Sequence, residues 1–219
     1  MTWGIRAAIL AAACAVLGGT SAGCGSGAVI YAEAEARTEL ERLSGLLRET
    51  AGLPEGFSAR PRDGWKPPFR PADRDCRRVL NEVGGASQRR ARSVRASATY
   101  HGDGLGELAG VSLTTYPGQG AEARFDDLAE ALEGCPAVTD PERGADTSLA
   151  ASGLDLAEIG DGTEARRLRG RLNGYPYEMN VVFVRSGQTL ISLVHAAVAD
   201  ADAGRTERLA RFFADRVTG

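Results

Sequence analysis

The fold is decided by residues 179–198, which read MNVVFVRSGQTLISLVHAAV. Two runs rich in β-branched residues, MNVVFVR and TLISLVHAAV, are apolar on both faces, which is typical of strands at the centre of a sheet. Ser186 and Gly187 lie between them and favour a tight hairpin turn. We therefore predict two central antiparallel strands, over 177–185 and 188–199.

The same reasoning extends along the chain in both directions. Asn173-Gly174 is a second hairpin signal, so a strand over 164–172 should precede the central pair, with another over 147–157. Alternation in SVRASATY and the turn-rich HGDGLGE predict a hairpin over 92–116. Helical spacing of apolar residues marks AEARTELERLSGLLRE, DRDCRRVLNEV, AEARFDDLAEALE and RTERLARFFADRV. The predicted fold is α+β, an antiparallel sheet of about five to six strands with helices packed on it.

The N-terminus has the three parts of a secretory signal: Arg6, an apolar run and a small-residue exit. Ser21-Ala22-Gly23-Cys24 resembles the bacterial lipobox, in which the cysteine becomes lipid-linked and is the first mature residue. We predict a lipoprotein-type signal peptide over 1–23, a lipidated Cys24 with a tether over 24–35, and one sensor-like α+β domain over 36–219. The alternatives are plain secretion and an uncleaved anchor.

Four cysteines are present. Cys14 leaves with the leader and Cys24 is the predicted lipid site, which leaves Cys76 and Cys135 as one pair in an oxidising compartment. Both continue the apolar stripe of a helix, so we predict one inter-helix disulfide, with free thiols as the alternative. A metal site is not expected, because the two histidines do not lie at ligand spacing to a cysteine.

The charge pattern and the motifs point away from several classes of function. With 26 Lys and Arg against 29 Asp and Glu, the net charge is −3, which gives no reason to expect a nucleic-acid partner. No nucleophile, metalloprotease or phosphate-loop motif is present. His195 lies in an apolar strand and is either a buried, hydrogen-bonded histidine or a general base. The stretches 101–107 and 200–204 could in principle bind a cation, but fit a hairpin turn and a helix start better.

One strand has an unusual charge pattern. In RRLRGR, the side chains of Arg167, Arg169 and Arg171 fall on one face. They could form an anion-binding surface for a phosphate, carboxylate or lipid headgroup. The alternative is a solvated face paired with carboxylates, for which Glu178 on the next strand is a candidate.

The order of the motifs resembles the PknH-like extracellular sensor-domain family of actinobacteria. The resemblance rests on LSGLL followed by LPEGF, an early helix with Cys76, FDDLAEALEGC, IGDGTEARRLR and VVFVRSGQTLISL, and it spans residues 40–217. It implies a cleft-bearing sheet domain that senses an unidentified ligand, with no catalytic residues.

Together these observations predict a free-standing, non-enzymatic lipoprotein on the extracytoplasmic side of the cell membrane. Its partners would be the membrane, through the N-terminal lipid, and a small ligand or an envelope protein, with no cofactor. The alternatives are a structural or assembly factor of an envelope complex and an uncharacterised envelope hydrolase that uses His195.

Overall fold

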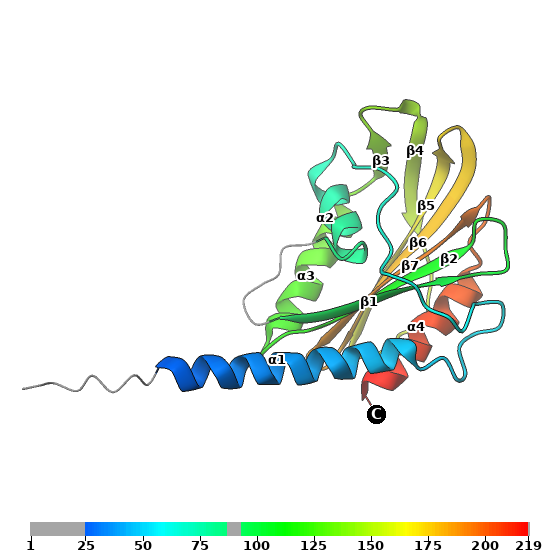
Figure 1. Cartoon of the computed structure of the whole chain (residues 1–219). Helices are drawn as coiled ribbons and strands as arrows, with labels where there is room; N and C mark the ends of the chain where they lie inside the picture. The colour runs from blue at the N-terminus through cyan, green and yellow to red at the C-terminus, as the bar shows by residue number, and fades with distance from the viewer. Residues whose placement is uncertain (1–24, 87–92, 219) are drawn as a thin grey trace, which may run out of the picture.

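The computed structural model describes residues 25–86 and 93–218, and the side chains from residue 32 onward. The predicted signal peptide and Cys24 lie outside the described residues. Figure 1 shows four helices around one twisted antiparallel sheet. The predicted α+β class is therefore confirmed. The sheet contains seven strands in the order β1-β2-β7-β6-β5-β4-β3. They are β1 (Val94–His101), β2 (Leu108–Thr115), β3 (Ala137–Asp140), β4 (Gly144–Gly153), β5 (Gly162–Leu172), β6 (Tyr175–Ser186) and β7 (Thr189–Val198).

The strand count exceeds the predicted five to six because of β3. This strand overlaps the start of a stretch that was expected to be a polar loop. This strand has only four residues and pairs with β4 at the edge of the sheet. A strand this short and partly polar carries too little alternation to be recognised from sequence. β4 accordingly begins at Gly144 rather than at residue 147.

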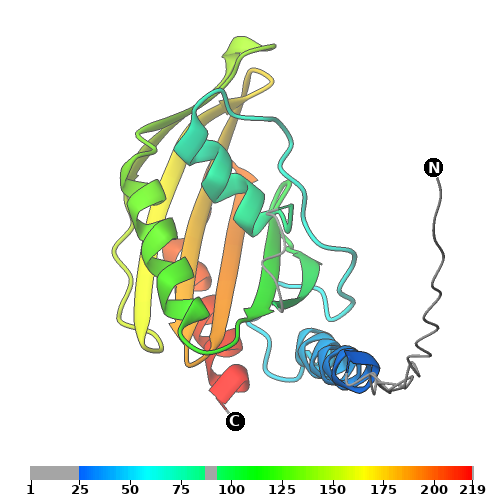
Figure 2. The same cartoon turned by 90° about the vertical axis from the view of Figure 1, so that its left-hand side faces the viewer.

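The β6–β7 hairpin is central, as predicted, and both of its faces are buried. Alternate residues of β6 enter two separate hydrophobic clusters, with Val181 and Phe183 in one and Val182 and Val184 in the other. Helices α2 (Arg74–Val83) and α3 (Gly120–Glu133) cover the first face, and α4 (Ala203–Thr218) covers the second. Figure 2 shows this arrangement, with α2 and α3 in front of the sheet and α4 behind it.

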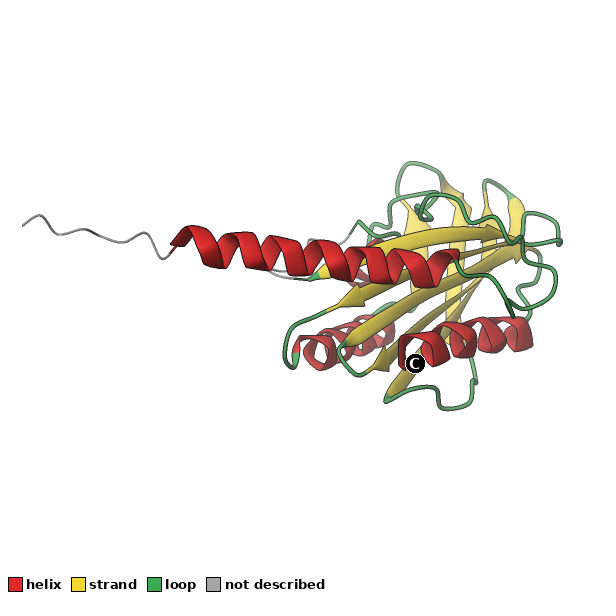
Figure 3. Ribbon diagram, turned by 60° about the horizontal axis from the view of Figure 1, so that its bottom comes forward, coloured by secondary structure: helices red, strands yellow, loops and turns green. Residues whose placement is uncertain are grey.

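Helix α1 (Gly25–Arg48) buries side chains against the domain in its C-terminal half. Leu43 and Leu47 are buried, and the Tyr100 hydroxyl donates to the Leu47 carbonyl at 2.5 Å. Leu40, which sequence placed on the packed stripe, is 42% exposed, and side chains 32–38 are exposed. Figure 3 shows the N-terminal half of α1 projecting beyond the sheet. The helix begins at Gly25, inside the predicted tether, where an alanine-rich sequence favours helix.

No helix within 25–86 and 93–218 combines the length and the apolar character that a membrane span requires.

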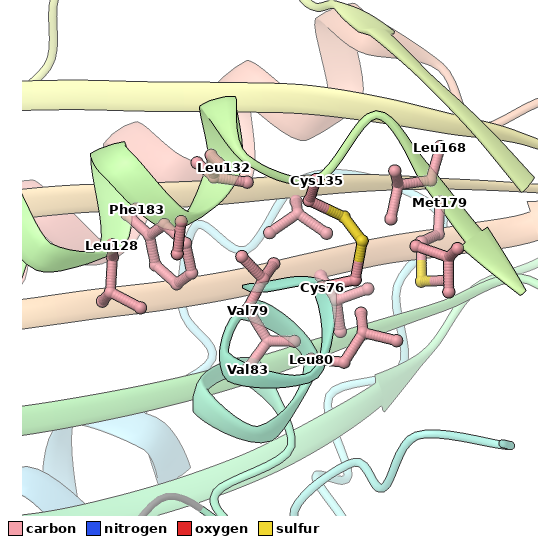
Figure 4. Packing of buried hydrophobic residues seen from close by; sticks show 14 of the residues in the cluster. Cys76, Val79, Leu80, Val83, Leu128, Leu132, Cys135, Leu168, Met179 and Phe183 are labelled. Carbon is pink, nitrogen blue, oxygen red and sulfur yellow. A yellow bond between two sulfur atoms is a disulfide. The ribbon is translucent and has the colours of Figure 1, made fainter. Parts of the chain in front are cut away.

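The predicted disulfide joins Cys76 to Cys135, with the two Cα atoms 4.8 Å apart. Cys76 lies in the first turn of α2, where Asp73 caps the helix by accepting from the Cys76 backbone N–H at 2.9 Å. Cys135 follows α3 directly after Gly134, and both cysteines are buried. Figure 4 shows the sulfur atoms packed among Val79, Leu132 and other apolar side chains.

A buried carboxylate fastens the same two helices to the sheet. Glu82 of α2 has no exposed surface and forms ion pairs with Arg95 of β1, at 2.5 Å, and with Arg124 of α3. Each carboxylate oxygen meets a different arginine, which offsets the cost of removing this charge from water. The disulfide holds the N-terminal end of α2 next to the end of α3, and the ion pairs of Glu82 hold the C-terminal end of α2 to α3 and β1.

The proline-rich segment between α1 and α2 forms backbone hydrogen bonds to both edge strands of the sheet. Near its start, Arg62 and Thr99 of β1 exchange backbone hydrogen bonds of 2.9 and 3.1 Å. Near its end, the Ala72 N–H donates to the carbonyl of Thr139 in β3 at 3.1 Å. Between these points Trp65 packs against Gly110, where a Cβ would lie 2.4 Å from the Trp65 Cβ.

Removing the disulfide should lower the free energy of unfolding substantially. The sequence separation of 59 residues corresponds to about 4 kcal/mol in the chain-entropy model, so the double variant Cys76→Ser, Cys135→Ser should lose about that amount. Urea unfolding followed by tryptophan fluorescence measures it. Wild-type protein with the disulfide reduced is the control and should show a similar loss. A loss below about 1 kcal/mol in both would contradict the prediction.

Candidate functional site

A buried polar network lies between the sheet and α4, in an otherwise apolar layer. His195 of β7 and Asn180 of β6 are direct cross-strand neighbours, and neither has exposed surface. Thr206 of α4 lies against both: its hydroxyl is 2.8 Å from His195 Nδ1, and it accepts from Asn180 Nδ2 at 2.9 Å. Asn180 Nδ2 also donates to the Ala201 carbonyl at 2.9 Å. Two strands and a helix thus meet through three buried side chains.

The β1–β2 turn brings a carboxylate to the other side of the imidazole. Glu107 Oε1 lies 2.9 Å from His195 Nε2, and Glu107 Oε2 accepts from the Gly104 N–H at 2.8 Å. The glycines of this turn make room for the acid, because a Cβ at Gly102 would lie 2.3 Å from Glu107 Oε2. The stretch that the sequence identified as a hairpin turn therefore also wraps around a buried glutamate.

Arg205 of α4 supplies the positive charge of the network. Its guanidinium lies 2.9 Å from Glu107 and 3.0 Å from Asp103, and it donates to the Glu55 carbonyl at 3.0 Å. The same guanidinium lies 4.6 Å from the centre of the Phe57 ring, and that ring meets His195 edge-on at 5.5 Å. Arg205 thereby joins α4 to the β1–β2 turn and to the segment that follows α1.

Burial lowers the pKa of His195, although its hydrogen bond to the Glu107 carboxylate opposes this shift. A neutral imidazole carries one N–H, and placing it on Nε2 lets it donate to the Glu107 carboxylate. The Thr206 hydroxyl then has two acceptors within reach, His195 Nδ1 at 2.8 Å and the Asp202 carbonyl at 2.9 Å, for its single proton. The Arg205 guanidinium forms an ion pair with the Glu107 carboxylate, so a neutral His195 does not leave this carboxylate without a positive partner.

A hydroxyl, an imidazole and a carboxylate in series are the components of a hydrolase triad. Here His195 and Thr206 have no exposed surface and Glu107 is 7% exposed, so no substrate reaches the hydroxyl in this conformation. The network is instead suited to positioning α4, because its buried hydrogen bonds favour one arrangement over shifted ones, although Asn180 Oδ1 and Arg205 Nε have no hydrogen-bond partner among the described residues.

The structure shows where each residue singled out in the sequence lies. His195 is a buried, hydrogen-bonded histidine, the first of its two interpretations. The stretch 200–204 leads into α4, with Asp202 Oδ1 accepting from the Arg205 N–H at 2.5 Å. Sequence reasoning missed Asn180, Glu107 and Thr206. Two signals were available in the sequence. Asn180 and His195 are polar residues in two apolar strands, and three glycines precede Glu107 in HGDGLGE.

Two of the three β5 arginines, Arg167 and Arg169, form ion pairs with carboxylates. Arg167 and Arg169 lie 3.2 and 3.5 Å from Glu178, which is 2% exposed, and Arg169 also pairs with Asp200 at 3.0 Å. Arg171 is exposed, and no ion pair reaches it from the described parts of the chain. The three arginines do share a face, as predicted, but anion binding by them stays a prediction.

Grooves of modest size open on the surface of the described part of the chain, away from the His195 network. One of about 320 Å³ lies between α1 and the edge of β1. Another of about 340 Å³ lies between the outer part of α1 and the end of β2. A third of about 420 Å³ lies between the proline-rich segment and the β3–β4 turn.

Comparison with known proteins gives a fold-level relationship. No protein-family model matches the chain, and no curated protein sequence matches it. Among solved structures, the extracellular domain of PknH from Mycobacterium tuberculosis is similar, with a TM-score of 0.57 and 12% sequence identity. The similarity covers 82% of this chain and 96% of that domain. The resemblance inferred from the order of motifs is thus supported at the level of the fold.

The His195 network should make the protein less stable in mild acid. Because the folded-state pKa of His195 is lowered, the unfolded chain binds a proton first as the pH falls below about 6.5. Stability is therefore complete above that pH and is lost as the pH falls toward the folded-state pKa. Urea midpoints measured from pH 7.5 to 5 should fall, and His195→Gln should flatten this dependence.

His101 provides the matched control, because it is exposed at the end of β1. His101→Gln should leave the pH dependence as in the wild type. An unchanged slope in His195→Gln would show that other groups cause the acid sensitivity.

Proposed function

We propose that this protein is a non-enzymatic envelope lipoprotein that displays a sensor-like binding domain outside the cytoplasmic membrane. The observation that carries the proposal is the buried Cys76–Cys135 disulfide in a fold that a known extracellular domain shares. Disulfides of this kind form and persist in oxidising compartments and are rare in the cytosol. The secretory leader in the sequence leads to the same location.

The lipid anchor rests on Cys24 and its place in the chain. Helix α1 begins at the next residue, Gly25, and its side chains from residue 32 to Thr38 are exposed. At about 1.5 Å per residue, the helix from Gly25 to Thr38 is about 20 Å long. A lipidated Cys24 would therefore carry the domain on a helical stalk above the bilayer, and several acyl chains would make attachment firm.

A binding role agrees better with the site geometry than a catalytic one. The groups with catalytic chemistry, His195, Thr206 and Glu107, are enclosed and hydrogen-bonded to one another. Open space lies instead in surface grooves that are large enough for a small ligand or a short peptide. We therefore place the function in recognition of a ligand or protein partner.

Membrane fractionation of the full chain in an actinobacterial host tests the anchor. Cys24→Ala should move the protein from the membrane fraction to the soluble extracytoplasmic fraction, because it removes the acylated thiol. Cys14→Ala is the matched control, since that cysteine leaves with the leader, and it should stay with the membrane. Intact mass of the wild type should show acyl groups on a chain that begins at Cys24. Membrane retention of Cys24→Ala would contradict the anchor.

A further inference from the structure

Strand β1 is one edge of the sheet, and only part of this edge is covered. The Ser58 N–H donates to the His101 carbonyl at 2.8 Å, and Arg62 exchanges two backbone hydrogen bonds with Thr99. The covering segment therefore pairs with the C-terminal part of β1. Beyond Thr99 the segment leaves the edge and crosses one face of the sheet. Gly64 lies against the Ser97 side chain, where a Cβ would be 2.2 Å from Ser97 Oγ, and Trp65 packs over β2 at Gly110.

The next outward-facing residue of the edge is Ser97. In an antiparallel strand, alternate residues direct their backbone groups to the same side. Thr99 and His101 face the covering segment, so Ser97 faces outward as well. Ser97 is exposed, and no hydrogen bond from the described residues reaches its outward backbone groups. An edge with free N–H and C=O groups is a template for another strand.

A groove of about 320 Å³ lies in front of this free edge. Its floor is Ala96–Ala98, whose small side chains leave the space open. Ser44, Leu47 and Arg48 of α1 form one wall, and Pro61, Arg62 and Asp63 form the other. An added strand lies about 4.8 Å from the edge strand, so its backbone would run inside this groove.

The charges around the groove favour an acidic occupant. Arg48 and Arg62 stand on opposite walls, both are exposed, and neither forms an ion pair within the described parts of the chain. Asp63 is the acidic residue of the lining, which leaves a net positive charge. A carboxylate in the groove would meet a guanidinium from either wall, a pairing that gives short, directional hydrogen bonds.

We propose that the free edge of β1 at Ser97 binds an extended acidic peptide segment of a protein partner by strand addition. Backbone hydrogen bonds to Ser97 hold the segment, and Arg48 and Arg62 select a carboxylate side chain. The covering segment occupies Thr99, so the paired stretch is short, about three to five residues, which gives weak and reversible binding. This inference rests on the proposed binding role, but not on the lipid anchor.

The test uses the full chain in detergent and a defined peptide pool. The pool contains acetylated pentapeptide amides with Asp or Glu at the centre and Val, Ile, Thr or Tyr elsewhere. A matched pool carries Asn or Gln at the centre, and another carries Pro beside it. Hydrogen exchange should show the Ser97 amide slowed by at least about tenfold with the acidic pool at saturation. The proline pool should give no protection, and the amide pool less.

Variants separate the backbone contribution from the charge contribution. Arg48→Ala and Arg62→Ala should each weaken binding of the acidic pool by about three- to tenfold, and leave the amide pool unaffected. Arg60→Ala is the matched control, since Arg60 is exposed but does not line the groove, and it should bind as the wild type does. Ser97→Pro should abolish binding by removing the N–H, whereas Ser97→Ala should retain it.

Absence of protection at Ser97 with the acidic pool would overturn the proposal, as would equal protection by the proline pool. Protection at Ser97 without peptide, together with a dimer in light scattering, would assign the edge to a second copy of this chain and would also overturn it. Peptide binding is measured in detergent and membrane attachment by fractionation. A failure of one therefore leaves the result of the other standing.

Discussion

Both faces of the β6–β7 hairpin are apolar, and neither can be left in water. Fully burying one aliphatic side chain contributes about 1.5–3 kcal/mol, and this hairpin contributes such side chains to two separate clusters. The constraint explains why helices cover the sheet on two sides. It also explains why this hairpin lies inside the sheet, away from the edge strands β1 and β3.

The edges create a second requirement, which one irregular segment meets. The prolines between α1 and α2 prevent regular structure there, so the chain stays extended and its backbone groups remain available. It bonds β1 through Arg62 and β3 through Ala72, while Trp65 fixes its path over Gly110. Within the described parts of the chain, its hydrogen bonds to β1 reach His101 and Thr99 but not Ser97, and this leaves the proposed binding edge beside α1.

Polar groups in the two buried layers determine which arrangement of helices is adopted. Apolar packing alone tolerates small shifts of a helix on a sheet, whereas hydrogen bonds and ion pairs do not. Glu82 with its two arginines and the disulfide fix α2 and α3 on one face. On the other face, Thr206 and Arg205 fix α4 through His195 and Glu107. The helices on each face of the sheet are thus held in place by their own set of specific polar or covalent contacts.

The sequence by itself determined the features that follow local periodicity. These were the central strands around Ser186-Gly187, the hairpin over 92–116, the helical stripes and the single cysteine pair within the domain. The tertiary structure alone decided which distant residues meet. Glu107 and His195 are 88 positions apart, and β3 acquires its identity only by pairing with β4. Secondary structure is encoded in neighbouring residues, whereas a buried polar contact depends on the path of the whole chain, which no short pattern contains.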